Sequence, residues 1–243
     1  VTDLDGTLLD HQSYSWAPAK PALARLSKLG IPVVLNSSKT RSEIRQLRQQ
    51  LSLSSPFIAE NGAILDWGDG GAEGFAEPRQ HLLQVLAQLR DQGFAFAGFA
   101  DWDRRQVARM TGLDQAQAAL AMDREFTEPL LWQGDDDALA AFHQALARHG
   151  LQAQQGGRFL SVMGQYSKGA CLSALRARYP GRRLIALGDS PNDAPMLDLA
   201  DIAVVIRSPR SDLLSPLGPC IRTQQPGPAG WNQAIQDILD NRS

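Results

Sequence analysis

The chain has 243 residues, of which 43% are hydrophobic and 21% charged, and its formal net charge is −2. This composition is ordinary for a globular protein of one or two domains. It gives no electrostatic attraction to nucleic acid or to an anionic membrane. No apolar run approaches the roughly 20 residues of a membrane-spanning helix, and no signal peptide is visible. We expect the natural chain to begin before Val1, because the first predicted strand is otherwise unusually short.

Helical and strand patterns alternate along the first 65 residues. Apolar residues recur at helical spacing in two segments, and short apolar runs bounded by polar residues separate them. The predicted elements are a helix over residues 22–29, a strand over 31–35, a helix that opens on a capping box of Thr40 and Glu43, a strand over 57–59 and a turn over 60–62. Such alternation is typical of a parallel sheet covered by helices.

The pattern changes near Asp66 and stays different up to Gly164. The predicted elements there are a loop or hairpin over residues 67–74, helices over 78–92, 103–110, 114–122 and 135–149, strands over 94–99 and 125–132, and a hairpin over 151–163 that turns at residues 156–157. Pro129 lacks the N–H that a sheet ladder needs, so we expect its strand at an edge or a bulge. We interpret residues 66–164 as an inserted α+β domain.

From Ser167 the first pattern returns. The predicted elements are a helix that starts near Lys168 and carries Leu172 and Leu175, strands over residues 184–187 and 202–206, and helices over 193–200 and 229–239. The simplest architecture is an α/β fold. Its core is a Rossmann-like parallel sheet with helices on both faces, built by residues 1–65 and 165–243.

The two cysteines, Cys171 and Cys220, form neither a metal-binding motif nor a disulfide framework. Cys171 falls in an apolar helical pattern, which predicts a buried thiol. Free thiols fit a reducing compartment, so we expect a cytoplasmic protein.

Two carboxylates, Asp3 and Asp5, stand at the end of the first predicted strand. Residues two apart on a strand point to the same side, and the carboxyl ends of strands are where α/β sheets bind ligands. Gly6 and Thr7 allow the chain to turn there. Capping of a loop by the two aspartates is the alternative interpretation.

A second acidic motif, Gly188–Asp193, directly follows the apolar run at residues 184–187. Clustered carboxylates repel one another unless a cation neutralises them. Mg²⁺ is a hard cation that prefers oxygen ligands and often bridges to a phosphate. Helix capping is the alternative for Asn192 and Asp193, but it explains Asp189 less well.

Two weaker motifs complete the set. Lys168, at a predicted helix start, can anchor a phosphate or hold the charge of a nucleophile, although a lysine there is more often solvated. Ser37 and Ser38 follow the strand at residues 31–35, where hydroxyl and backbone N–H groups can hold phosphate oxygens. A plain N-cap turn is equally compatible with that segment. Each motif follows a strand or opens a helix, so all can meet at one edge of the sheet.

With these motifs in this order, the sequence resembles the haloacid dehalogenase-like superfamily of phosphatases. The Asp3–Thr7 and Gly188–Asp193 motifs are the specific ones, and Ser37 and Lys168 fall where that family expects them. Residues 60–63 and the insertion resemble the subgroup with an α/β (C2-type) cap. Three further segments resemble mannosyl-3-phosphoglycerate phosphatases: residues 36–40, 110–113 and 124–129.

The resemblance implies a two-step covalent mechanism that depends on Mg²⁺. Asp3 would attack phosphorus and form an aspartyl phosphate, which water then hydrolyses. Asp5 would protonate the leaving alcohol and later deprotonate the water. Asp3, the Asp5 carbonyl and Asp189 would hold Mg²⁺, with Asp193 in support. Ser37 and Lys168 would bind the transferring phosphoryl oxygens.

The expected partner is a small phosphorylated sugar-glycerate substrate, mannosyl-3-phosphoglycerate above all, with no nucleic acid and no membrane. The cap would select it and exclude water. The candidate substrate-binding residues are Ser38, Lys39, Asn192, Arg124 and Arg158, and each cation among them also fits a plain surface role. The tryptophans Trp67, Trp102 and Trp132 suit buried packing better than sugar stacking, and residues 135–137 suit an acidic first turn of a helix better than a metal site.

Three alternatives stay open at this point. The first is a broad or different sugar-phosphate phosphatase, including one for glucosyl-3-phosphoglycerate. The second is a phosphomutase, which needs the aspartyl phosphate shielded from water. The third is a binding or regulatory protein without turnover, against which the complete set of Asp3, Asp5, Lys168 and Asp189 argues. The sequence leaves the oligomeric state undefined.

Overall fold

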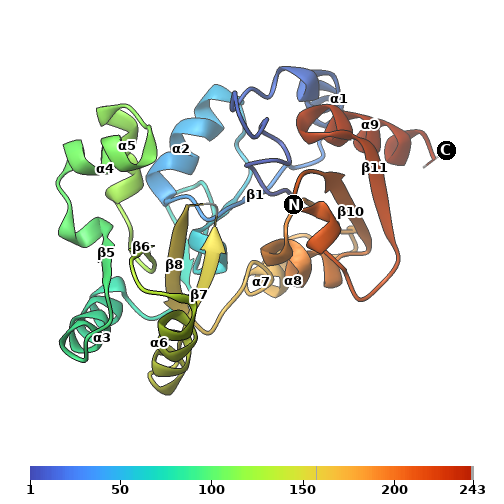
Figure 1. Ribbon diagram of the computed structural model, residues 1–243. Coiled ribbons are helices and arrows are strands. Elements are labelled where there is room, and N and C mark those ends of the chain that lie inside the picture. The colour runs from blue at the N-terminus through green and yellow to red at the C-terminus, as the bar shows by residue number, and fades with distance from the viewer. Residues whose placement is uncertain (157, 242–243) are drawn as a thin grey trace. The chain divides into compact units, whose positions relative to one another are not determined.

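The computed structural model describes residues 1–156 and 158–241 (Figure 1). Its contacts divide the chain into two compact units. The first unit comprises Val1–Ser38, Arg48–Glu73 and Ser167–Ser243, and the second comprises Lys39–Leu47 and Gly74–Tyr166. The assignment of a catalytic core to residues 1–65 and 165–243 and of a cap to residues 66–164 stays a prediction.

The first unit contains a mixed sheet whose centre is parallel. Its strands are β1 (Leu35–Asn36), β2 (Phe57–Ala59), β3 (Ile64–Asp66), β4 (Ala72–Gly74), β9 (Ile185–Gly188), β10 (Ile202–Arg207) and β11 (Cys220–Pro226). They pair in the orders β1-β2-β3-β4 and β11-β10-β9. Thr2 forms parallel bridges to both Leu35 and Leu187, so the start of the chain lies between β1 and β9. This is the predicted α/β fold.

Helices cover both faces of that sheet (Figure 1). The helical segments of this unit are η1 (Ala17–Ala19), α1 (Lys20–Lys28), η2 (Glu60–Gly62), α7 (Leu172–Arg178), η4 (Pro191–Asp193), α8 (Ala194–Asp198), η5 (Ser211–Leu213) and α9 (Gly227–Asp240). Helices α7 and α8 share an apolar cluster with sheet residues such as Ile58, Ala186 and Val205. On the other side, Trp231 of α9 donates its Nε1–H to Thr2 Oγ1 at 3.0 Å.

The second unit is an antiparallel sheet with paired helices. Its elements are α3 (Arg79–Asp91), β5 (Phe96–Gly98), η3 (Phe99–Asp101), α4 (Arg104–Thr111), α5 (Gln115–Met122), β6 (Glu128–Trp132), α6 (Asp136–Arg148), β7 (Leu151–Gly156) and β8 (Phe159–Gly164). The strand order is β5-β6-β8-β7. Leu82 and Leu86 of α3 and Phe142 and Leu146 of α6 pack with the sheet in one cluster. Helices α4 and α5 enclose a smaller cluster around Phe99.

Two of the predicted helix starts are confirmed by their capping contacts. Helix α2 (Arg41–Gln50) opens on the predicted capping box: Thr40 N–H donates to Glu43 Oε2 at 2.8 Å, and Glu43 N–H donates to Thr40 Oγ1 at 3.2 Å. Asp135 accepts from the Ala138 N–H at 2.8 Å and so caps α6, as an acidic first turn should.

The packing expected of the thiol and the tryptophans is also confirmed. Cys171 is buried and its Sγ–H donates to the Gly62 carbonyl at 3.2 Å, and burial raises the pKa of this thiol to about 12. Trp67, Trp102 and Trp132 each pack, partly buried, against an apolar cluster of their own unit. The predicted hairpin at 151–163 is present as β7 and β8, and residue 157 of its predicted turn lies outside the described residues.

The strand predicted over residues 31–35 is shorter than expected. Only Leu35 and Asn36 join the sheet, where Leu35 pairs with Phe57. Pro32 and Pro56 lack backbone N–H groups, so the residues before Leu35 and Phe57 cannot continue the ladder regularly.

The expected edge position of Pro129 is wrong. Its strand β6 lies between β5 and β8, and Pro129 pairs with Ser161 of β8. The sheet tolerates this proline because the pairing with β5 ends at Gly98 opposite Leu130, one residue away. No β5 residue of that ladder therefore needs an N–H from Pro129.

Strand β11 was not predicted. It follows β10 in the sheet, where Cys220 pairs with Ala203, and its side chains are mostly exposed. The polar run at residues 222–225 resembles a loop because a parallel edge strand with little buried surface leaves no alternating pattern. Among the described helices, none combines the length and the apolarity needed to cross a membrane.

Candidate active site

The chain start brings Asp3 to the centre of the sheet edge. Asp3 N–H donates to the Leu187 carbonyl at 2.9 Å, and the Asn36 N–H donates to the Thr2 carbonyl at 2.8 Å. The chain then leaves the sheet, since the Thr7 and Leu9 N–H groups both turn back to the Leu4 carbonyl. Asp3 therefore lies between the ends of β1 and β9, where ligands bind in α/β sheets.

Asp5 lies in this turn rather than on a strand. Strand alternation, from which we expected Asp3 and Asp5 to face the same side, therefore does not position Asp5. Gly6 makes the turn possible with a left-handed φ of +88°, and a Cβ on it would come 2.6 Å from Asp189 Oδ2. A side chain at residue 6 would thus be strained and would also displace an acidic group.

The second acidic motif folds around Asp193. Its Oδ2 accepts from the backbone N–H groups of Asp189 at 3.0 Å and Ser190 at 3.1 Å, and its Oδ1 accepts from Lys168 Nζ. Asp193 therefore caps the loop after β9 and also belongs to the charged cluster. The capping interpretation of this residue is confirmed, and its functional role stays a prediction. Asn192 lies on the same short helix and accepts from the Ser190 hydroxyl at 2.6 Å.

Lys168 lies in a turn, four residues before α7 begins at Leu172, so the expected helix start is wrong. The segment is a turn instead, in which the Ala170 N–H donates to the Ser167 carbonyl at 2.9 Å. The Asn36 side-chain amide holds it by donating to the Lys168 carbonyl at 2.8 Å. Gly62, with φ of +99°, lets the backbone approach closely, since a Cβ there would lie 2.0 Å from the Ser167 carbonyl.

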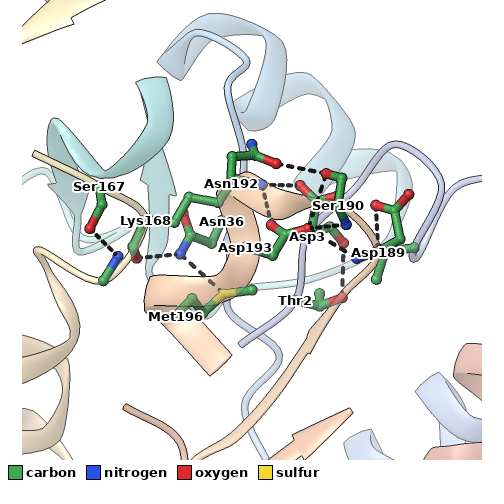
Figure 2. Close-up of polar contacts among 12 residues, drawn as sticks. Thr2, Asp3, Asn36, Ser167, Lys168, Asp189, Ser190, Asn192, Asp193 and Met196 are labelled. Atoms are coloured by element: carbon green, nitrogen blue, oxygen red, sulfur yellow. Dashed lines mark hydrogen bonds and ion pairs between the residues drawn. The ribbon is translucent and has the colours of Figure 1, made fainter. Parts of the chain in front are cut away.

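The Lys168 ammonium lies between two carboxylates (Figure 2). Its Nζ is 2.5 Å from Asp3 Oδ1 and 2.6 Å from Asp193 Oδ1. Lys168 is 2% exposed, Asp3 6% and Asp193 0%. Buried charges of this kind are tolerated only when they are paired and hydrogen-bonded.

Burial and neighbouring charges shift the pKa values of Asp3, Asp189 and Lys168. Burial and the Asp193 carboxylate raise the pKa of Asp3 well above its usual value, while Lys168 opposes the rise. Burial and Asp193 likewise raise the pKa of Asp189. Burial alone would lower the pKa of Lys168, but the carboxylates of Asp193 and Asp3 outweigh it, so the net shift is upward. The cluster holds more negative charge than one lysine neutralises.

The residues present fit a divalent metal ion. Asp3, Asp189 and Asp193 each offer a carboxylate oxygen, and these three oxygens lie within 4.8 Å of one another. Three buried carboxylates and one ammonium leave an excess of negative charge, which a divalent cation would balance. Hard oxygen donors are the ligands that Mg²⁺ prefers. We find Asp5 next to this group in sequence, through the Asp3–Thr7 turn, but its carboxylate is not among the three.

Ser37 follows β1 and is held from two sides. Its N–H donates to the Ile58 carbonyl at 3.1 Å, and its carbonyl accepts from the Asn61 N–H at 2.9 Å. Glu60 and Asn61 both adopt left-handed backbone, with φ of 49° and 61°, so the turn that carries this second contact is strained. Ser37 is buried and the next residue, Ser38, is exposed. The position of Ser37 is thus fixed by backbone contacts.

The predicted substrate-binding cations belong to the second unit. Arg124 donates to the Ala121 carbonyl at 3.1 Å and to Thr127 Oγ1 at 2.8 Å, and its guanidinium lies 5.6 Å from the centroid of the Phe99 ring. Arg158 donates to the Met110 carbonyl. Lys39 is half-buried. These contacts of Arg124 and Arg158 hold the fold of their own unit.

Three residues support the acidic cluster without having been predicted to do so. Thr7 Oγ1 donates to Asp189 Oδ1 at 3.2 Å, Ser208 Oγ donates to the Asp189 carbonyl at 3.1 Å, and Asn36 anchors Lys168. The sequence does contain a local signal for two of these roles: Thr7 belongs to the Asp3–Thr7 motif, and Asn36 is the polar residue that ends an apolar run. The role of Ser208 has no local signal, because it depends on β10 lying beside β9.

Comparisons with known proteins agree with this fold. Residues 1–96 match the family of haloacid dehalogenase-like hydrolases. A phosphatase of the haloalkanoate enzyme superfamily from Bacteroides thetaiotaomicron aligns with a TM-score of 0.75 and 21% identity, over 98% of this chain and 93% of its own. A Thermoplasma acidophilum protein aligns with a TM-score of 0.74 and 17% identity, over 98% of this chain and 96% of its own. A subclass IIB sugar phosphatase of the same superfamily gives a TM-score of 0.72 at 14% identity, over 98% and 97% of the two chains. The chain has the fold of these proteins.

The metal fit predicts a stability change that can be measured without substrate. Free Mg²⁺ at about 100 times its Kd should raise the free energy of unfolding by about 2.7 kcal/mol, because only the folded chain assembles the three carboxylates. Asp189→Asn should lose most of this gain in urea denaturation. Asp137→Asn, which removes a carboxylate from the first turn of α6, should keep all of it. An equal gain in Asp189→Asn and in the unchanged protein would contradict the assignment.

Proposed function

We propose that this protein is a Mg²⁺-dependent phosphatase that hydrolyses a phosphomonoester of a small sugar-type metabolite through an aspartyl phosphate on Asp3. The observation that carries the proposal is the buried Asp3 carboxylate, held 2.5 Å from Lys168 Nζ beside two further acids. The family match over residues 1–96 and the fold shared with a sugar phosphatase support it. We assign catalysis to the first unit, selection of the substrate to the second, and a cytoplasmic location to the protein.

In the first step Asp3 would act as the nucleophile. Lys168 stabilises the ionised form of this buried carboxylate by an ion pair at Oδ1, which leaves Oδ2 for attack on phosphorus. The new bond joins Asp3 Oδ2 to phosphorus, and the bond from phosphorus to the substrate oxygen breaks. Asp5, as a carboxylic acid, would give its proton to that departing oxygen.

In the second step water would release the phosphate. Asp5, now a carboxylate, takes a proton from the water as the water oxygen bonds to phosphorus. The bond between phosphorus and Asp3 breaks, which restores the Asp3 carboxylate and gives inorganic phosphate. Both residues thus return to their starting protonation states.

Charge on the phosphoryl oxygens is what the protein must stabilise in both steps. Lys168 carries a positive charge close to Asp3, and its raised pKa keeps it protonated. Ser37, fixed by its backbone contacts, would donate to a phosphoryl oxygen, and Asn192 would add a further polar contact. Asp3, Asp189 and the Asp5 carbonyl would hold Mg²⁺, with Asp193 in support. When bound, the metal supplies positive charge against the same oxygens.

For the substrate we propose mannosyl-3-phosphoglycerate, which would give mannosylglycerate. The motifs at residues 36–40, 110–113 and 124–129 support this choice. A glycerate carboxylate and a phosphate both suit cationic and hydroxyl side chains. Ser38, Lys39, Arg124 and Arg158 are the residues proposed to meet them.

Asp3→Asn should reduce Mg²⁺-dependent phosphate release by at least about 1,000-fold, as the loss of a nucleophile does in other covalent mechanisms. The amide has the same shape but cannot form the aspartyl phosphate. Far-UV circular dichroism should stay close to that of the unchanged protein, because Lys168 keeps its ion pair with Asp193. The matched control is Asp212→Asn, which neutralises an exposed carboxylate in η5 and should retain full activity. Full activity in Asp3→Asn would exclude it as the nucleophile.

A panel of phosphorylated metabolites tests the substrate separately. Mannosyl-3-phosphoglycerate should give the highest kcat/KM, with its glucosyl counterpart, 3-phosphoglycerate and mannose 6-phosphate at least about tenfold lower, because each changes or lacks a recognised group. Phosphate release with and without a chelator provides the readout. Equal kcat/KM across the panel would refute this substrate and leave the chemistry of Asp3 standing.

A further inference from the structure

The first unit contains a cavity of about 820 Å³ that does not include the acidic cluster. Its wall includes residues 30–33 and 52–56, which precede β1 and β2, and Tyr179 and Arg182, which precede β9. These strands run in one direction, because β1 is parallel to β2 and Thr2 forms parallel bridges toward both β1 and β9. The cavity therefore lies at the edge of the sheet opposite to the one that carries Asp3.

Cations dominate the charge of this cavity. Lys20, Arg178 and Arg182 line it, against the single carboxylate of Asp69, which accepts from the Gly71 N–H at 3.1 Å. Within residues 1–156 and 158–241, no ion pair neutralises any of the three cations. A concave surface with excess positive charge attracts anions, and the arginine forks match phosphate geometry.

An aromatic wall stands beside these cations. Trp67 lines the cavity, and its Nε1–H donates to Glu73 Oε1 at 2.8 Å, which fixes the orientation of the indole ring. The Arg178 guanidinium lies 6.0 Å from the centroid of that ring. Tyr179 and Trp16 also line the cavity. An aromatic ring can stack on a planar group of a ligand, and the neighbouring arginines can bind an anionic group of the same ligand.

The size of the cavity limits the kind of ligand. Its volume of about 820 Å³ falls in the range of roughly 300–1,000 Å³ in which proteins bind small molecules. The net charge of −2 for the whole chain argues against an extended nucleic acid. A single molecule that has both phosphate groups and a flat ring satisfies the cations and the aromatic wall together.

We propose that this cavity binds a nucleotide, with its phosphates on Arg178, Arg182 and Lys20 and its base against Trp67. The site is independent of the proposed phosphatase chemistry, because it uses none of the residues at the other edge of the sheet. It would give the protein a second ligand, recognised by charge and stacking.

Isothermal titration calorimetry with ADP tests the proposal, in EDTA so that Mg²⁺-dependent turnover cannot occur. ADP should bind the unchanged protein. Adenosine and ribose 5-phosphate should each bind at least about tenfold more weakly, because each lacks one of the two recognised parts. The double variant Arg178→Gln, Arg182→Gln should weaken ADP binding by at least about tenfold. The matched double variant Arg104→Gln, Arg105→Gln, in the exposed first turn of α4, should bind ADP as the unchanged protein does.

The proposal is overturned if ADP gives no binding heat at millimolar concentration or if the Arg178 and Arg182 variant binds ADP with unchanged affinity. Ribose 5-phosphate binding as tightly as ADP would also overturn it, since the ring would then contribute nothing. Circular dichroism of both double variants verifies that each is folded, so that a loss of binding reports on the cavity.

Discussion

The ion pairs of Lys168 with Asp3 and Asp193 are the interactions on which the rest of this site depends. Charged side chains this deeply buried are stable only with partners, and removing one partner of such a pair leaves an uncompensated buried charge. Lys168 satisfies two carboxylates at once, at 2.5 and 2.6 Å. The backbone around it is arranged accordingly: Asn36 holds the Lys168 carbonyl, and Gly62 lets the two segments approach.

A single lysine lies among three acids, so the carboxylates of this site are only partly neutralised. Burial, together with the excess negative charge, raises the pKa values of Asp3 and Asp189, and a hard cation would neutralise that charge. Residues that follow β1 and β9 converge there because Thr2 joins both strands in parallel. The opposite edge of the same sheet gathers cations that form no ion pair within the described part of the chain, so the two edges differ in the sign of the charge that they carry.

Much of this arrangement could be predicted, because its signals are local. The Gly188–Asp193 motif follows a short apolar run, the Asp3–Thr7 motif pairs two acids with a turn, and the parallel topology brings such positions together. Other features depend on contacts distant in sequence. Ser208 reaches Asp189 only because β10 lies beside β9, and β11 is a polar edge strand without alternation. Pro129 is tolerated within a sheet because the neighbouring strand ends one residue earlier.

The most direct test of the account is to trap the phosphorylated enzyme. A single turnover of p-nitrophenyl phosphate with Mg²⁺, quenched in acid and analysed by peptide mass spectrometry, should place a phosphoryl group on Asp3. Asp5→Asn should accumulate more of it, because Asp5 is proposed to activate the water that hydrolyses it. A phosphoryl group on another residue, or rapid phosphate release from Asp3→Asn, would contradict the assignment of Asp3 as the nucleophile.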